Sequence, residues 1–261
     1  MEIYQGILLG ILQGVTEFLP VSSSGHLILG QHFFNLTQPM LSFDISVHMG
    51  TLFAILIVFF KDIKKIVTES DIKFISLIIT GCIPTAVIGY TIKIWEEVIF
   101  SSVLLVGFML IITGIFLWLT RTKQTNYEHK NFKASNLGYK SAFFIGVCQG
   151  VAVIPGISRS GATISAGLFA NLDRKMAAKF SFLLSVPAII GAHILQLADS
   201  MGKPFTISKA TLSGTLAAFI TGYIALVFLL KIVNKGKIHI FAPYCITAGV
   251  LITIYHLTSL L

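Results

Sequence analysis

The chain has 261 residues, of which 55% are hydrophobic and 11% are charged, and its formal net charge is +8. Soluble domains carry about 25% charged residues, so this chain cannot cover a water-facing surface along most of its length. The positive charge does not indicate nucleic-acid binding, because the basic residues lie in short clusters between long apolar runs, as in the cytoplasmic loops of membrane proteins. The composition therefore predicts an integral membrane protein and excludes a soluble nucleic-acid-binding protein.

Two apolar regions are interrupted by polar turns. Residues 3–35 are broken at Pro20 and at the serines that follow it, and residues 141–171 are broken at Pro155 and around Arg159. A turn at membrane depth is tolerated only where it is buried in protein or faces water. Each region is therefore predicted to form a re-entrant hairpin of two half-length helices.

Six further apolar stretches are continuous and have about the 20 residues that a membrane-spanning helix needs. They run near 43–60, 74–95, 102–120, 178–198, 210–230 and 241–260. The fold class predicted from these elements is an all-α integral membrane protein with six spanning helices and two re-entrant helical hairpins.

The distribution of Lys and Arg supports this topology. The arrangement places 15 basic residues on one side, in loops 61–73, 121–140, 172–179 and 231–240, and three lysines on the other. Cytoplasmic loops are enriched in Lys and Arg, so the basic loops are predicted to be cytoplasmic. The second hairpin then enters from the cytoplasm and the first from the outer side.

The two interrupted regions also resemble each other in sequence. Residues 10–26 and 146–162 share a Gln-Gly-Val triplet and a Ser-Gly pair at the same offset, each with a proline between them. We therefore expect two inverted repeats, residues 1–120 and 141–261, joined by a basic cytoplasmic connector, residues 121–140. Inverted repeats bring broken helices together near the bilayer midplane, and their N-termini can bind anions there.

Polar and ionisable side chains cluster at the two predicted turns. An ionisable group in a spanning segment costs about 2.5–3.5 kcal/mol on insertion scales, so each is a functional candidate. The candidates are Gln13, Glu17, Ser22, Ser23, Ser24 and His26 in the first hairpin, and Ser158, Arg159, Ser160 and Thr163 in the second.

Each candidate also has a structural interpretation. Glu17 and Arg159 could form an ion pair that only stabilises the fold. The serines could cap helix N-termini, although a capping serine can also be a nucleophile. His26 alone would more often be a hydrogen-bonded interior histidine, but beside three serines and a carboxylate it is favoured as functional.

Three residues of the predicted spans are harder to assign. The sequence leaves His48 open between a structural and a functional role. Asp44 is interpreted as an interfacial charge, and His193 as a structural histidine.

This set of groups suits phosphoryl transfer, which needs charge neutralisation, an in-line nucleophile and a proton acceptor. Arg159 can contact phosphate through two N–H groups. A serine oxygen can attack phosphorus while His26 or Glu17 takes its proton. Glu17, with Gln13 one helical turn earlier, could hold a divalent cation against phosphate oxygens.

The motifs LQGVTEFLPVSSSGHLIL, IPGISRSGATISAGL and FSFLLSVPA resemble the undecaprenyl-pyrophosphate phosphatase family, also called the bacitracin-resistance family. The resemblance covers essentially the whole chain. It implies removal of the terminal phosphate of undecaprenyl pyrophosphate, which returns the lipid carrier to cell-wall synthesis. It also implies dependence on Mg²⁺ or Ca²⁺, and a multi-pass protein of the bacterial cytoplasmic membrane whose site opens to the outer face.

The resemblance also assigns roles to residues. The family's acidic motif falls on Gln13 and Glu17, but many members have Glu at the first position, so Gln13 can offer a metal only its amide oxygen. The serine-rich turn makes Ser23 the candidate nucleophile, with His26 as a catalytic residue. The groups implied to bind phosphate are Ser22, Ser24, Ser158, Arg159, Ser160 and Thr163.

Other functions are weighed against the phosphatase. The type-2 phosphatidic-acid phosphatases need a Lys-x6-Arg-Pro motif and a histidine downstream of their Ser-Arg pair. They are excluded because this chain has no Arg-Pro and because the next histidine after Arg159 is His193. A transporter or flippase for an anionic polyprenyl-phosphate lipid remains the alternative, since inverted repeats with broken helices are typical of transporters. The Ser-Ser-Ser-Gly-His turn beside Glu17 favours the enzyme, because transport needs no nucleophile. The sequence leaves open whether the chain forms a homodimer.

Overall fold

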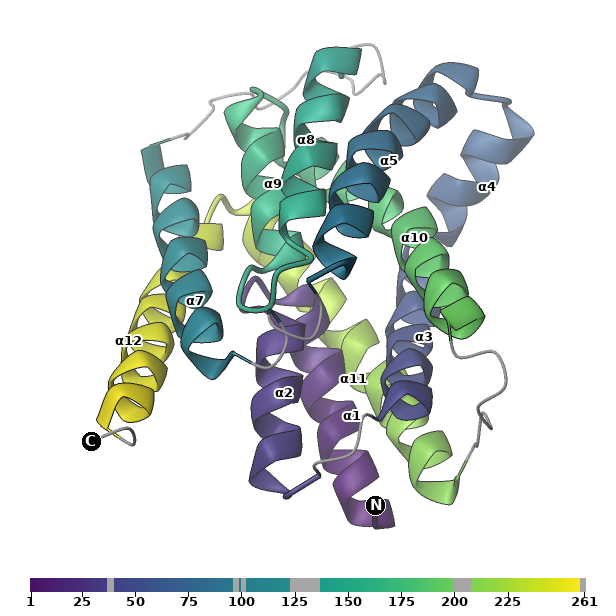
Figure 1. Ribbon diagram of the computed structural model, residues 1–261. Helices are drawn as coiled ribbons and strands as arrows, with labels where there is room; N and C mark the ends of the chain where they lie inside the picture. The colour runs from purple at the N-terminus through teal and green to yellow at the C-terminus, as the bar shows by residue number, and fades with distance from the viewer. Residues whose placement is uncertain (37–39, 96–98, 100–101, 123–136, 200–207, 259–261) are drawn as a thin grey trace.

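The computed structural model describes residues 1–36, 40–95, 99, 102–122, 137–199 and 208–258, and the regular structure in these ranges is helical (Figure 1). The helices are α1 (Ile3–Phe18), α2 (Ser23–Phe33), α3 (Leu41–Val58), α4 (Phe60–Thr68), α5 (Ile72–Lys93), α7 (Val103–Leu119), η1 (Thr120–Thr122), α8 (Tyr139–Val151), α9 (Arg159–Phe169), α10 (Arg174–Asp199), α11 (Lys209–Asn234), η3 (Ile238–Phe241) and α12 (Ala242–Thr258). The predicted all-α class is confirmed.

Six helical segments in the described ranges are long and apolar enough to cross a membrane. They are Leu41–Val58, Ile72–Lys93, Val103–Thr122, Arg174–Ala198, Lys209–Asn234 and Ile238–Thr258. Each overlaps one of the predicted spans, so the prediction of six spans is confirmed. Helix α4 was not predicted, because it lies in a lysine-rich loop whose pattern was interpreted only as polar. Residues 123–136 of the predicted connector lie outside the described residues.

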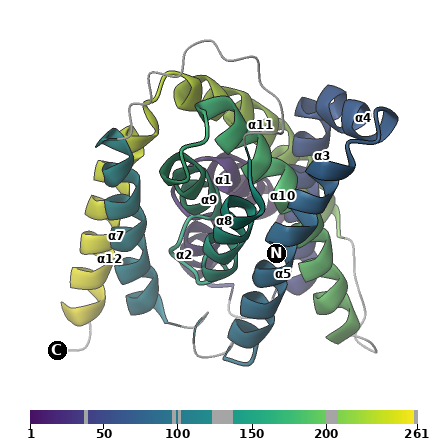
Figure 2. The same cartoon turned by 90° about the horizontal axis from the view of Figure 1, so that it is seen from above.

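The two interrupted regions form helical hairpins, α1–α2 and α8–α9. Figure 1 shows them entering the molecule from opposite ends and meeting in its middle, and Figure 2 shows them surrounded by the longer helices. Helix α1 ends where Leu19 adopts extended backbone angles, as expected for a residue that precedes proline. The second turn contains Gly156 at φ +96°, a conformation that costs glycine little.

Each hairpin packs closely against a long helix of the other half. At Gly10 of α1, an added Cβ would lie 2.1 Å from the carbonyl oxygen of Gly214 in α11. At Gly146 of α8, it would lie 2.1 Å from the carbonyl oxygen of Gly81 in α5. Small residues allow helix backbones to approach this closely in membranes. The reciprocal packing agrees with two related halves, while the inverted repeat and the domain division remain predictions.

Candidate active site

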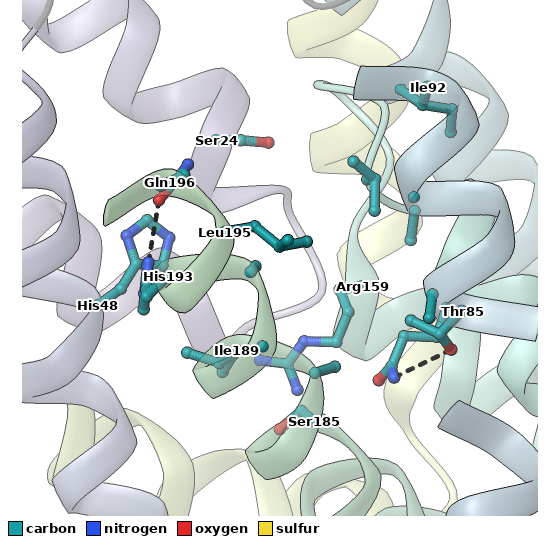
Figure 3. A pocket seen from close by; sticks show the side chains of 18 of the residues that line it. Ser24, His48, Thr85, Ile92, Arg159, Ser185, Ile189, His193, Leu195 and Gln196 are labelled. Carbon is teal, nitrogen blue, oxygen red and sulfur yellow. Dashed lines mark hydrogen bonds between the residues drawn. The ribbon is translucent and has the colours of Figure 1, made fainter. Parts of the chain in front are cut away.

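A cavity of about 690 Å³ lies where the two hairpin turns meet α3, α5 and α10 (Figure 3). Its polar end is lined by Thr16, Glu17, Ser23, Ser24, Asp44, His48, Ser158, Arg159, Ser185 and His193. The rest of its wall is mostly apolar. The predicted turns therefore come together, and several of the predicted site residues face one cavity.

The Glu17 carboxylate is the centre of the polar end. Its Oε2 accepts hydrogen bonds from Ser23 Oγ at 2.7 Å and from Gln13 Nε2 at 3.0 Å, and its Oε1 accepts one from Arg159 Nη2 at 2.5 Å. The residue is only 8% exposed. A buried carboxylate without compensation would be strongly destabilising, so these donors and the arginine charge explain how Glu17 is kept here.

Arg159 begins helix α9, and Figure 3 shows its side chain directed toward α10. The guanidinium lies over the ring of Phe182, with Cζ 5.9 Å from the ring centroid. Its Nη1 is buried and has no hydrogen-bond partner among the described residues. An unpaired buried donor is costly, so this geometry leaves an N–H group available for an acceptor in the cavity, such as a phosphate oxygen.

Ser23 is the turn serine that bonds to the carboxylate, and it lines the cavity. A hydroxyl donating to a carboxylate matches the pairing of a nucleophile with its base. Ser24 and Ser158 also line the cavity. Ser158 in addition caps α9, because its Oγ accepts the backbone N–H of Gly161 at 3.1 Å.

Ser22, Ser160 and Thr163 are not among the described residues that line the cavity. Ser22 Oγ accepts the backbone N–H groups of Gly25 at 3.4 Å and Gly156 at 3.0 Å, so it ties the two turns together. Thr163 Oγ1 donates to a backbone carbonyl of its own helix and lies beside Ser181 Oγ. The structure thus gives Ser22 and Thr163 capping and packing contacts, and the phosphate contacts predicted for Ser22, Ser160 and Thr163 stay predictions.

His26 also lies away from the cavity. Its Nδ1 is 2.8 Å from the carbonyl oxygen of Ser22, so that nitrogen carries the hydrogen and donates it. Its Nε2 lies 2.6 Å from the Tyr244 hydroxyl of α12, and the two rings are stacked. Both ring nitrogens therefore have partners other than Glu17, and the catalytic role predicted for His26 stays a prediction.

Sequence reasoning undervalued three residues that the fold brings to the polar end. His48 Nε2 lies 3.8 Å from Glu17 Oε2, and the centroids of the His48 and His193 rings are 5.6 Å apart (Figure 3). Asp44 faces the same cavity, where its Oδ1 accepts from Gln31 Nε2 at 2.7 Å. The available signal was the position of these ionisable groups inside otherwise apolar spans.

No three His, Cys, Asp or Glu side chains come together as a metal site in the ranges that the structure describes. Mg²⁺ is commonly held by one or two carboxylates together with substrate phosphates, so a complete protein cage is not required. Gln13 Oε1 is buried, lacks a partner in the described part of the chain, and belongs to the amide that contacts Glu17. Glu17 therefore fits the protein's share of such a site, whereas Gln13 is fully buried and is not among the described residues that line the cavity.

The fold and cavity define a polytopic membrane protein with a polar site at the meeting point of two re-entrant hairpins. The sequence model of the family described as "Bacitracin resistance protein BacA" matches residues 6–251. The chain belongs to this family.

Curated relatives match nearly the whole chain. An undecaprenyl-diphosphatase of Desulforapulum autotrophicum is 54% identical over 272 residues, covering 96% of this chain and 97% of that protein. Another, of Desulfosudis oleivorans, is 48% identical and covers 95% of this chain and 97% of that protein. A third, of Halothermothrix orenii, is 43% identical, covering 97% of this chain and 98% of its own length.

Proposed function

We propose that the chain hydrolyses undecaprenyl diphosphate to undecaprenyl phosphate and inorganic phosphate. The observation that carries this proposal is the contact of the buried Glu17 carboxylate with the half-buried Ser23 and Arg159, which brings a candidate nucleophile, its proton acceptor and a phosphate-binding cation into one cavity. The relatives named undecaprenyl-diphosphatase support it. Hydrolysis of the diphosphate would recycle a lipid carrier for cell-wall synthesis.

In this proposal each side chain has one task. The free Nη1 of Arg159 donates to an oxygen of the terminal phosphate and stabilises the charge that builds up there. Ser23 Oγ attacks phosphorus as its proton passes to Glu17 Oε2, and undecaprenyl phosphate leaves. Water then attacks the phosphoserine and leaves as part of inorganic phosphate with both of its protons, while Glu17 returns the proton to Ser23 Oγ and is again a carboxylate. A direct attack by water, with Glu17 as base, would use the same contacts.

A divalent cation, Mg²⁺ or Ca²⁺, is part of the proposal. Glu17 Oε2 and the amide oxygen of Gln13 would hold it together with substrate oxygens. Such a cation neutralises negative charge on the transferring phosphate. Orienting the amide oxygen toward the cation requires rotation of the Gln13 side-chain amide, whose nitrogen now donates to Glu17.

The location of the proposed reaction follows from the charge pattern. We place the protein in the bacterial cytoplasmic membrane, with the basic loops in the cytoplasm and the cavity open toward the outer side. The lysine-rich loop 61–73 and the start of α10 then lie in the cytoplasm, and Lys93 lies at the outer end of α5. The bilayer itself supplies the substrate.

The test of the function is phosphate release from undecaprenyl diphosphate by detergent-purified protein, with Mg²⁺, Ca²⁺ or a chelator. Wild type should release phosphate only with metal, and Ser23→Ala should lower kcat by about a hundredfold because the nucleophile is lost. Ser213→Ala is the matched control, since that hydroxyl donates to the Ala210 carbonyl within α11 and Ser213 is not among the described residues that line the cavity. Absence of release by folded wild type would favour the alternative, a transporter of the lipid.

Gln13→Glu tests the position that departs from the family's acidic pair. We expect the variant to keep kcat within about threefold of wild type, because a carboxylate supplies the same oxygen to the cation. The concentration of Mg²⁺ that gives half-maximal activity should stay the same or fall. Loss of activity in a folded variant would show that the amide nitrogen bonded to Glu17 is required.

A further inference from the structure

The cavity extends from its polar end into an apolar arm between α5 and α10. Its apolar lining includes Gly89 and Tyr90 of α5 and Gly191, Ile194 and Leu195 of α10, and the polar side chains of Lys93 and Gln196 line the same cavity. Figure 3 shows Ile92 on one side and Ile189 and Leu195 on the other, with the Arg159 side chain between the two sides and beside Ile189. The arm and the site around Arg159 are parts of one cavity.

The arm opens at the surface of the protein. Tyr90, Ile194 and Leu195 line the cavity and yet are 62%, 61% and 45% exposed. They lie on two helices long and apolar enough to cross a membrane. Ala86 also lines the cavity and is seven residues before Lys93, the last residue of α5. At 1.5 Å per residue, the two residues are about 10 Å apart along the helix axis. The opening therefore lies toward the Lys93 end of α5, between two helices whose composition suits contact with lipid.

Small residues keep the arm open. A Cβ added at Gly191 would meet no atom within 4 Å, and one added at Gly89 would meet only Val153 Cγ2, at 3.6 Å. By contrast, the glycines that join helices elsewhere, such as Gly10, have backbone atoms of a neighbour at the Cβ position. Close helix contact therefore does not require glycine at positions 191 and 89, and each has room for a side chain beside the arm.

We propose that this arm binds the first isoprene units of the substrate's chain, and that Gly191 and Gly89 set the width of this subsite. The inference rests on the proposed function. In a polyprenyl diphosphate the apolar chain is attached directly to the phosphate head, so a head held by Arg159 places the first isoprene units inside the cavity. The arm has a mostly apolar lining, is continuous with the head site and opens between two helices whose composition suits contact with lipid, which matches the direction that the chain must take.

Substitution of Gly191 by leucine tests the arm without touching the phosphate site. Gly191→Leu should raise KM for undecaprenyl diphosphate about tenfold or more, because a hydrophobic pocket discriminates by this amount for small changes in volume. With isopentenyl diphosphate, whose chain is a single isoprene unit, kcat/KM should change less than about threefold. Gly191→Ala should fall between wild type and the leucine variant for the long substrate.

Two further variants complete the design. Gly89→Leu narrows the arm from the α5 side and should repeat the same selectivity, so the test does not depend on one variant folding. Gly138→Leu is the matched control, because Gly138 also has no atom within 4 Å of an added Cβ but lies at the start of α8, away from the cavity. It should resemble wild type with both substrates.

The outcomes separate the inference from the proposed function. Equal losses on the long and the short substrate, or an unchanged KM for undecaprenyl diphosphate in both folded leucine variants, would overturn the assignment of the arm while wild-type hydrolysis still stands. Absence of phosphate release from either substrate by wild type would overturn the proposed function, and the arm assignment with it.

Discussion

Arg159→Ala is expected to lower kcat/KM for phosphate release by about a thousandfold, the upper range for loss of one donor that stabilises transition-state charge. The guanidinium contacts Glu17 through Nη2 and leaves Nη1 for the substrate, so both the phosphate contact and the compensation of the carboxylate are lost. The measurement is the rate of phosphate release at several concentrations of undecaprenyl diphosphate. We expect kcat to fall together with any increase in KM.

Three companion variants make this test specific. Arg121→Ala removes an arginine that lies over Trp118, with Cζ 5.4 Å from the ring centroid, and should leave activity unchanged. Arg159→Lys keeps the charge but not the two-pronged geometry, so it should recover only part of the activity. Arg159→Ala combined with Glu17→Gln avoids an unpaired buried carboxylate, and comparing the detergent elution of this double variant with that of Arg159→Ala shows whether the lost ion pair affects folding. Normal turnover in Arg159→Ala would remove this residue from the site.

Glu17→Gln is expected to lower kcat by about a hundredfold to a thousandfold, and to abolish the response to metal. General base catalysis contributes about 10²–10⁴-fold, and the amide cannot take the Ser23 proton. The substitution preserves the shape of the side chain, so the helix packing around α1 should remain. The measurement is phosphate release across a titration of Mg²⁺ and of Ca²⁺, with elution in detergent as a check of folding.

The control for this variant is Glu69→Gln. Glu69 forms an exposed pair with Lys65 at 3.8 Å, and exposed pairs contribute only about 0–1 kcal/mol to stability. The phosphate-release activity of Glu69→Gln and its response to metal should equal those of wild type. If Glu17→Gln shows an unchanged metal titration, the carboxylate does not hold the cation, even if turnover is reduced.

The architecture could be predicted from the sequence because its signals are local. A span is defined by about 20 consecutive apolar residues, and a break by proline and polar residues within such a run. The six spans and the hairpins were found in this way. The short helix α4 was missed, because it packs through only part of its surface, at Ile63 and Ile66, while its lysines give it the composition of a loop.

The composition of the site was predictable only in part. Glu17 and Arg159 could be identified because an ionisable group at membrane depth is costly in any arrangement. Residue chemistry alone could not rank the serines, since Ser22, Ser23 and Ser158 can all cap helices and can all be nucleophiles, and only the family resemblance favoured Ser23. Only the folded chain shows that Ser23 donates to Glu17 while Ser22 Oγ accepts the Gly156 backbone N–H from the other turn.

The sequence by itself determined that this protein lies in the membrane, which segments cross it, and which charges need a partner there. The tertiary structure decided the direction of each histidine: His26 turns to Tyr244, whereas His48 and His193 meet at the cavity. It also decided that α5 and α10 leave an open arm beside the site. The physical reason is that span length and polarity are properties of consecutive residues, whereas the rotation of each helix depends on close contacts between segments far apart in the chain.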